Sequence, residues 1–392
     1  MNSIDMDYSE RKQYLNFLKQ VEKNYNCEDF IFMGLHIWPI LTTVIMYIWR
    51  DAVRKIPEKE AQENASTKWY GPIRFVKGWF HINLHNYKRS NYMFVGNASF
   101  NTLYKNQYIN RYFDPILDAL EADKIKPIFF EKKVIVKRDN YKKERINDLL
   151  SPFTYYWNSY KGRKIRKNIN TDTVQEIHPH LNLIINELAA ELHLNNTVIY
   201  KRIIGFVQQV IIWEKVFNSI LKKVKPQYSF LINYASSMGY GFVYACKSEK
   251  VKVTDIQHGA QGKMHWAYLG FNLYPTSGYN SMPDYFWVWD TNSEKFLINE
   301  FKDCKTINVI HGGNPWISFL MGKGEIYEMN RNRKIILITL QPIEPVIEDF
   351  VFDSIKLLDN QYEFWIRFHP RMNEYKKNEI KKLFARKGLT NL

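Results

Sequence analysis

Two histidines of this sequence directly follow predicted strands, where a side chain is well placed to do chemistry. One lies in Gln257-His258-Gly259 and the other in Phe368-His369-Pro370. In open α/β sheets, ligands bind outside the carboxyl ends of the strands. A glycine or proline after the histidine ends the strand and fixes the imidazole on a turn. A single strand-end histidine is more often structural than catalytic, but two in one chain favour a functional interpretation.

His258 is the candidate general base, because a neutral imidazole with an ordinary pKa of about 6.5 can accept the proton of a substrate hydroxyl. The residues around it form a glycine-containing loop with a cation and a second imidazole, which suits a sugar or an anionic group. The predicted acceptor and loop contacts are Gln257, Gly259, Lys263 and His265. His265 is expected to be a loop residue rather than a catalyst.

A second candidate site would bind phosphate. Arg367 and His369 lie two residues apart and so point to the same side of a strand. Arginine matches phosphate with two hydrogen bonds, and imidazole can donate one more. Gly313 and Asn314, in the turn 311–315, are further candidates for contacting donor phosphates. This turn fits neither GxGxxG nor the P-loop pattern, and an interdomain hinge is the alternative.

Other chemistries find little support in the residue patterns. The turn 236–241 lacks the GxSxG spacing of a hydrolase nucleophile. The three cysteines are scattered, and His178 and His180 have no ligand partner at metal spacing. We therefore expect no metal or organic cofactor, and a reducing compartment without disulfides.

The chain is strongly basic, with a formal net charge of +15 over 392 residues. Such a charge favours anionic partners: nucleic acid, anionic lipid or nucleotides. The densest basic runs are 132–145 and 161–167. They are interpreted as solvated faces, with a membrane-surface role as the alternative. No nucleic-acid-binding signature is visible, so nucleic acid is not an expected partner.

The expected location is the cytoplasm, with peripheral attachment to the inner face of the cell membrane as an extension of the membrane-surface alternative. The polar, acidic start of the sequence lacks the pattern of a signal peptide. Residues 30–49 are uncharged and about as long as a membrane span, but Pro39 interrupts them. They are expected to form a buried helix–loop–helix.

Strand-like and helix-like segments alternate from about residue 90, which predicts βαβ units and parallel sheets. The strands are expected at 92–95, 127–130, 228–233, 252–256, 284–289, 306–310, 334–340 and 363–368, with helices at 111–122, 171–224, 348–358 and 373–386. We divide the chain into an N-terminal unit, 1–298, and a C-terminal unit, 299–392. Three strands are fewer than the usual five or six of a nucleotide domain, so the C-terminal unit is expected to be incomplete.

Residues 225–392 resemble bacterial GT-B glycosyltransferases that build surface polysaccharides. The group includes teichoic-acid glycerophosphotransferases, capsule Kdo transferases and bacterial polysialyltransferases. The resemblance rests on the HG motif at His258, the strand 283–289, the turn 313–315 and the HP motif at 367–370, in that order.

The resemblance implies an α/β enzyme with two Rossmann-like domains facing a cleft. The N-terminal domain would bind the acceptor, a polysaccharide or a lipid-linked molecule, and the C-terminal domain would bind a nucleotide-sugar donor. His258 would be the general base, and His369 with Arg367 would hold the donor phosphates without a metal. Two alternatives stay open: a non-catalytic scaffold of a polysaccharide-assembly complex, and a basic nucleic-acid-binding protein.

Overall fold

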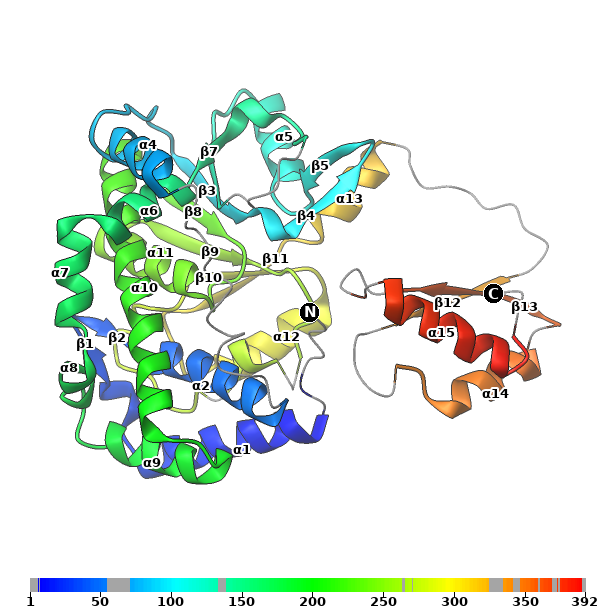
Figure 1. Ribbon diagram of the computed structural model, residues 1–392. Coiled ribbons are helices and arrows are strands. Elements are labelled where there is room, and N and C mark those ends of the chain that lie inside the picture. The colour runs from blue at the N-terminus through cyan, green and yellow to red at the C-terminus, as the bar shows by residue number, and fades with distance from the viewer. Residues whose placement is uncertain are drawn as a thin grey trace. The chain divides into compact units, whose positions relative to one another are not determined.

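A seven-stranded parallel sheet is the centre of the larger of two units (Figure 1). In this computed structural model, the described residues are 6, 8–54, 71–132, 139–262, 265–269, 271–323, 334–340, 346–358, 360–368, 372 and 374–389. The larger unit is Tyr14–Glu325, and the smaller unit combines Met1–Gln13 with Ile326–Leu392. Both units contain parallel strands and helices, so the α/β class is confirmed.

The order in which the chain adds strands to the sheet changes direction between two central strands. The order is β11-β10-β9-β8-β3-β6-β7, with every neighbouring pair parallel. Its strands are β3 (Tyr92–Asn97), β6 (Ile128–Lys132), β7 (Ile146–Asp148), β8 (Tyr228–Leu231), β9 (Lys252–Ile256), β10 (Tyr285–Val288) and β11 (Asn308–His311). The chain runs outward from β3 to β7 and then outward on the other side from β8 to β11. The topological switch point therefore lies between β3 and β8, where open α/β sheets bind ligands.

Aromatic side chains explain why the central strands form. Phe94 of β3 is fully buried and stacks on Phe230 of β8 with ring centroids 4.7 Å apart. It also meets Phe113 edge-on at 5.3 Å, and Phe113 meets Phe129 of β6 at 5.7 Å. A parallel sheet covered on both faces needs such continuous apolar runs, which is why these strands were visible in the sequence.

Helices and short strands complete the larger unit. The helices are α1 (Tyr8–Asn24, which begins in the smaller unit), α2 (Trp38–Val53), α4 (Gly71–Asn83), α5 (Asp114–Ala122), α6 (Leu150–Asn158), α7 (Tyr160–Asn168), α8 (Thr171–Gln175), α9 (Leu181–Leu192), α10 (Asn196–Val224), α11 (Ser237–Ser248), α12 (Thr291–Glu300) and α13 (Pro315–Gly322). The hairpins are β1 (Ile31–Phe32) with β2 (Leu35–His36), and β4 (Asn101–Tyr104) with β5 (Gln107–Asn110). Single 3-10 turns lie at Cys27–Asp29, Ala98–Phe100, Lys143–Arg145 and Trp266–Tyr268.

The uncharged stretch 30–49 is buried in its helical part but exposed at Ile31 and Met33, and it is not a helix–loop–helix. The β1–β2 hairpin comes first, and α2 then runs without interruption from Trp38. Pro39 lies in the first turn of α2, where backbone N–H groups have no acceptor within the helix. The missing N–H of proline therefore costs no helical hydrogen bond, and Pro39 starts the helix instead of breaking it. None of the helices in the described part of the chain has the length and apolar character needed to cross a membrane.

The smaller unit is a compact βαβα arrangement. Strands β12 (Lys334–Thr339) and β13 (Tyr362–Arg367) pair in parallel, and helices α14 (Asp349–Leu358) and α15 (Glu374–Arg386) alternate with them. Phe352 and Phe384 lie edge to face at 5.1 Å and pack with buried Phe364 and Ile355. This unit therefore has a core of its own.

The strand expected at 306–310 does not open the smaller unit. It is β11, which pairs along its length with β10 in the large sheet. The larger unit consequently ends at Glu325 and not near residue 298. The sequence cannot say which sheet a strand joins, because that choice depends on pairing partners far away in the chain. The acceptor and donor roles assigned to the two units stay predictions.

Candidate functional site

The carboxyl edge of the large sheet collects polar residues from six consecutive strands of the order. Because the strands are parallel, their ends all lie along this one edge. The residues are Lys132 ending β6, Asn97 ending β3, Asn233 after β8, His258 after β9, Asp290 after β10 and His311 ending β11. Asn97 and Lys132 are register partners.

His258 is held from both sides of the switch point. Its ring is half-buried and lies edge to face with Phe100, with centroids 5.2 Å apart and an interplanar angle of 70°. Its backbone carbonyl accepts a hydrogen bond of 2.8 Å from the hydroxyl of Tyr112. Phe100 follows β3 and Tyr112 follows β5, so segments far away in the sequence position this imidazole. Beyond it, the space that a Cβ of Gly259 would enter is open.

An aromatic group surrounds the Tyr112 ring. Trp289, which follows β10, stacks on it with centroids 6.1 Å apart, and Phe100 meets it edge-on at 6.0 Å. The guanidinium of Arg111 lies 4.9 Å from the ring centroid. Burial raises the pKa of Tyr112, so its hydroxyl keeps its proton and remains a hydrogen-bond donor to His258.

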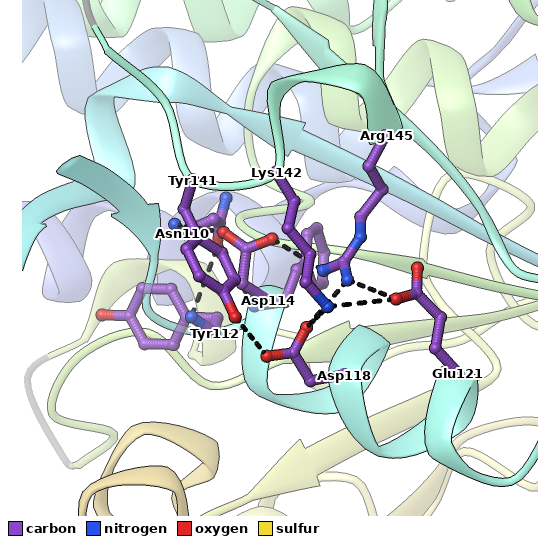
Figure 2. A network of polar contacts seen from close by, with 9 residues as sticks. Asn110, Tyr112, Asp114, Asp118, Glu121, Tyr141, Lys142 and Arg145 are labelled. Carbon is purple, nitrogen blue, oxygen red and sulfur yellow. Dashed lines mark hydrogen bonds and ion pairs between the residues drawn. The ribbon is translucent and has the colours of Figure 1, made fainter.

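The backbone at Tyr112 is fixed by the polar network in Figure 2. The Asn110 side-chain oxygen accepts hydrogen bonds from the backbone N–H groups of Tyr112 (3.2 Å) and Phe113 (3.1 Å). The backbone N–H of Asn110 donates to Oδ2 of Asp114 at 2.7 Å. The turn between β5 and α5 is therefore closed by its own side chains, which is the usual role of Asn and Asp at helix starts.

Arg145 anchors this turn to the following segment of the chain. Its guanidinium contacts the carboxylates of Asp114 (3.1 Å), Asp118 (2.7 Å) and Glu121 (2.7 Å), all on α5 (Figure 2). The Arg145 and Asp114 side chains are only 6% and 4% exposed, whereas Lys142, which also pairs with Asp118, is 36% exposed. Burial raises the pKa of Asp114 to about 7, although Arg145 favours its ionised form.

Both polar groups of the Gln257 side-chain amide form hydrogen bonds within the protein. Its oxygen accepts a 2.6 Å hydrogen bond from the backbone N–H of Trp289. Its NH₂ group donates to the carbonyl of Gly259 (3.0 Å) and the hydroxyl of Ser293 (3.3 Å). The side chain is 2% exposed, so it fixes the ends of β9 and β10 relative to each other. An acceptor contact by Gln257 stays a prediction.

The turn after β11 is shaped to begin a helix. Asn314 accepts hydrogen bonds from the backbone N–H groups of Trp316 (3.0 Å) and Ile317 (3.4 Å) and so caps α13. Gly313 has a φ of +73° and accepts a 2.8 Å hydrogen bond from the indole of Trp287. A Cβ on Gly312 would lie 2.1 Å from that indole ring. Phosphate binding by Gly313 and Asn314 stays a prediction.

Two ionisable groups on β6 and β9, one half-buried and one fully buried, were not among the predicted site residues. Burial lowers the pKa of Lys132, and no ion pair of the described residues involves its ammonium. Asp255 of β9 is fully buried, and one of its oxygens accepts the backbone N–H of Tyr234 at 3.2 Å. Burial raises the pKa of Asp255 well above its usual range, and this carboxyl group holds the turn from β8 to α11.

The remaining predicted site residues are dispersed. His265 is half-buried, with its ring 4.7 Å from that of Tyr268. Arg367 is exposed at the end of β13 in the smaller unit, where its carbonyl accepts the N–H of Leu340 at 2.9 Å. Lys263 and His369 lie outside the described residues.

The structure thus brings His258, Gln257 and Gly259 together with Phe100, Tyr112 and Trp289. No single-sequence signal connects Phe100 or Tyr112 to His258, because only the strand order makes them neighbours. Within the described ranges, no group of three or more His, Cys, Asp or Glu side chains is arranged to hold a metal ion.

Comparison with known proteins gives one weak structural likeness. No protein-family model matches this chain, and no curated protein sequence matches it. Among solved structures, UDP-GlcNAc 2-epimerase from Neisseria meningitidis bound to UDP-GlcNAc superposes with a TM-score of 0.38 and 13% identity, over 75% of this chain and 69% of the other. UDP-GlcNAc 2-epimerase from Methanocaldococcus jannaschii gives 0.35 and 13%, over 76% and 68%. Likeness at this level assigns no function, which has to come from the chain's own residues.

Proposed function

We propose that this protein is a glycosyl- or polyol-phosphate transferase that takes its group from a nucleotide-activated donor, with His258 as general base. The observation that carries the proposal is the placement of His258. Its imidazole lies at the carboxyl edge against the ring of Phe100, and the hydroxyl of Tyr112 holds its backbone carbonyl. A base must be held in one orientation to be effective, and this arrangement provides that.

In the proposed step, the hydroxyl of the acceptor gives its proton to the His258 imidazole. The hydroxyl oxygen forms a bond to the anomeric carbon of the donor, or to its phosphorus. The bond from that atom to the oxygen of the leaving phosphate breaks, and the nucleotide departs with the electron pair. Negative charge thus develops on the leaving phosphate, and a nearby cation or a row of N–H donors lowers the barrier.

Groups that would favour an anionic donor are present along the same edge. Lys132 supplies a cation at the end of β6. The amino end of α11 follows β8 directly and is capped by Ser236, which accepts the N–H of Gly239 at 3.0 Å. A helix amino terminus carries a partial positive charge. These features support a nucleotide-sugar partner.

The proposal gives the smaller unit the role of a donor-phosphate contact, through Arg367 and His369, and requires no metal. Arg367→Ala should weaken binding of the donor nucleotide by about 1.5–3 kcal/mol, the range for hydrogen bonds to charged groups. Calorimetry with CMP, CDP and UDP would measure it, with activity retained in EDTA as the check on the metal. Unchanged nucleotide affinity would remove Arg367 from the donor site.

The acceptor and the location are further parts of the proposal. A surface polysaccharide or lipid-linked acceptor, used at the cytoplasmic face of the membrane, follows from the resemblance of the sequence. Of the two basic runs, 161–167 forms most of α7, and four of its cations are exposed. In the run 132–145, by contrast, Lys142 and Arg145 are paired with carboxylates of α5. Among the described residues, the run 161–167 is therefore the more exposed of the two.

The decisive experiment compares His258→Ala with the wild-type protein. Donors are first found by calorimetry with a panel of UDP-, CDP- and CMP-linked sugars, and transfer to oligosaccharide acceptors is then followed. His258→Ala should keep its fold and donor affinity while transfer falls about 10²–10⁴-fold, the usual contribution of a general base. The matched control, His193→Asn, alters an exposed histidine in the left-handed region at the end of α9 and should leave transfer unchanged.

Two results would point elsewhere. Transfer by His258→Ala within a few-fold of wild type would remove His258 from the mechanism. Binding to random oligonucleotides with a steep salt dependence, and no binding of any nucleotide sugar, would favour the nucleic-acid alternative. A wild-type protein that binds neither class but associates with polysaccharide-assembly proteins would favour the scaffold.

A further inference from the structure

Helix α4 exposes a continuous apolar stripe. The most exposed large apolar side chains of this region are Ile73 (72%), Val76 (65%), Trp79 (44%), Phe80 (47%) and Leu84 (59%), the last directly after the helix. Ile73, Val76, Phe80 and Leu84 follow the three- and four-residue spacing that places side chains on one helix face. A surface helix normally carries polar residues there, so this stripe indicates an interface.

The opposite face of α4 is already packed. Gly78 lies so close to α6 that a Cβ on it would be 2.0 Å from the backbone oxygen of Ser151. Phe75 contacts Tyr155 of α6 with ring centroids 5.2 Å apart. The helix is thus apolar on two faces, of which α6 covers only one.

A basic hollow lies close to the carboxyl end of the same helix. It has a volume of about 660 Å³ and is lined by Arg89, Lys126 and Lys225 together with Tyr92. No acidic residue is among those lining it, and none of the three cations forms an ion pair within the described residues. The residues lie at or just before the starts of β3, β6 and β8, so the hollow is at the amino edge of the sheet.

Hydrogen bonds tie the hollow to the apolar stripe. The Lys223 ammonium donates to the backbone carbonyls of Ile82 (2.7 Å) and His85 (2.9 Å), which end α4. Lys225 of the hollow follows Lys223 by two residues. Between them, the carbonyl of Val224 accepts a hydrogen bond of 3.2 Å from the backbone N–H of Ser90. The hollow therefore lies next to the carboxyl end of α4, and we call the stripe and its cations together the α4 face: Ile73, Val76, Trp79, Phe80, Leu84, Arg89, Lys126 and Lys225.

We propose that the α4 face docks on a bilayer containing anionic phospholipid. The stripe would enter the boundary between headgroups and acyl chains, and the hollow would receive a lipid phosphate. Apolar side chains beside unpaired cations are the combination that binds helices to anionic membrane surfaces. A protein partner would need carboxylates placed next to an apolar patch. An anionic bilayer has negatively charged headgroups above an apolar interior over its whole surface.

This proposal is independent of the proposed transfer reaction, because no residue of the α4 face is among those placed around His258. Co-sedimentation uses the full chain with vesicles of phosphatidylglycerol and phosphatidylcholine in equal parts, and with phosphatidylcholine alone. We expect binding only to the anionic vesicles. It should fall steeply between about 0.1 M and 1 M salt, as the Debye length shrinks from about 10 Å to about 3 Å.

Two sets of variants test the two parts of the α4 face. Val76→Ser with Phe80→Ser should weaken vesicle binding at least about tenfold. Ile298→Ser with Leu103→Ser, which alters apolar side chains that are 53% and 60% exposed elsewhere, should not weaken it.

The triple variant Arg89→Ala, Lys126→Ala and Lys225→Ala should weaken binding roughly a hundredfold. Its control removes the same charge from exposed positions near α12, through Lys295→Ala, Lys302→Ala and Lys305→Ala. Equal losses in both triples would show that only net charge matters and would overturn the assignment to this face.

Other occupants of the α4 face give different results. A concentration-dependent dimer in sedimentation velocity that the serine variant dissociates would identify the face as an interface between two copies. Lower thermal stability of the serine variant, without any vesicle binding by the parent, would show that another segment of the chain covers the stripe. Either result would overturn the membrane proposal.

Discussion

The surroundings of His258 and the basic hollow treat their polar groups in opposite ways. At the carboxyl edge, Gln257 and Tyr112 are tied by hydrogen bonds to the backbone of neighbouring segments. At the amino edge, Arg89, Lys126 and Lys225 form no ion pair among the described residues. One edge is preorganised, as a base and its substrate require. The other keeps long, exposed cations, whose flexible side chains suit a surface without fixed geometry.

If this contrast is real, substitutions in the network that holds Tyr112 should cost stability, and substitutions of the cations of the hollow should not. The pair of Arg145 and Asp114 provides the strongest test, because both side chains are buried.

Arg145→Ala should produce the largest loss, about 3–5 kcal/mol in the free energy of unfolding, because it leaves the buried Asp114 carboxylate without its cation. Urea denaturation followed by circular dichroism would measure it. Lys142→Ala removes a cation of the same network that is 36% exposed, so it should cost less than about 1 kcal/mol. Similar costs for both variants would contradict a buried framework.

The cost of Arg145→Ala should also depend on pH. Burial raises the pKa of Asp114 to about 7, above its usual value of about 3.9. Between these values the native state binds a proton that the unfolded chain does not, so the contribution of Asp114 to stability grows as the pH falls through this window. A neutral Asp114 needs no cation, so Arg145→Ala should be less damaging near pH 5 than near pH 8. Equal costs at both would mean that Asp114 stays ionised.

Gly312→Ala should cost about 1–3 kcal/mol, because the new methyl group would overlap the indole of Trp287. The control is Gly205→Ala inside α10, where no atom lies within 4 Å of the new Cβ. That change should raise stability by about 0.5–1 kcal/mol, since alanine favours the helix. Thermal unfolding would show a loss of stability for Gly312→Ala and a gain for Gly205→Ala. An unchanged stability of Gly312→Ala would show that the turn can relax.

Tyr112→Phe should cost about 0.5–1.5 kcal/mol, the net value of the lost hydrogen bond to the carbonyl of His258. The ring and its stacking on Trp289 remain. If His258 is the base, kcat for transfer should fall roughly tenfold or more while the KM for the donor is unchanged. Tyr141→Phe, which loses a bond to Asp118 instead, should leave kcat unchanged. An equal fall in both would assign Tyr112 a merely structural role.

The smallest effect is expected at the amino edge. Replacing Arg89, Lys126 and Lys225 together by alanine should change the free energy of unfolding by no more than about 0.5 kcal/mol for each residue. A large loss in urea denaturation would show that these cations have structural partners and would remove the contrast between the edges.

Much of the framework was predictable from the sequence, because buried parallel strands form continuous apolar runs. The strand predicted at 252–256 is β9, and that at 334–340 contains β12. His258 could be placed at a strand end for the same reason. The β4–β5 hairpin was missed because its turn is Lys105-Asn106, both with positive φ, and not the more familiar Asn-Gly.

The surroundings of His258 could not be predicted from one sequence. Tyr112, which bonds to the carbonyl of His258, is 146 residues away in the sequence. Asn110 resembles any other turn residue in the sequence, and only the structure shows its hydrogen bond to Asp114. The misassigned β11 has the same origin, since pairing between distant strands leaves no local pattern. Periodicity reports which face of an element is buried and does not report what covers it.

The 29-residue helix α10 has a consequence for how this protein is made. It carries the chain back from the β7 side of the sheet to β8, so Val95 of β3 meets its partner Leu231 only after all of α5 to α10 has been synthesised. Pairing between such distant segments is slow, because the entropy of closing a long loop is lost before any stabilising contact forms. On the ribosome, β3, β6 and β7 emerge well before β8, and one edge of β3 then remains open. An exposed strand edge is a template for pairing with other chains, so the growing chain is open to aggregation at that stage.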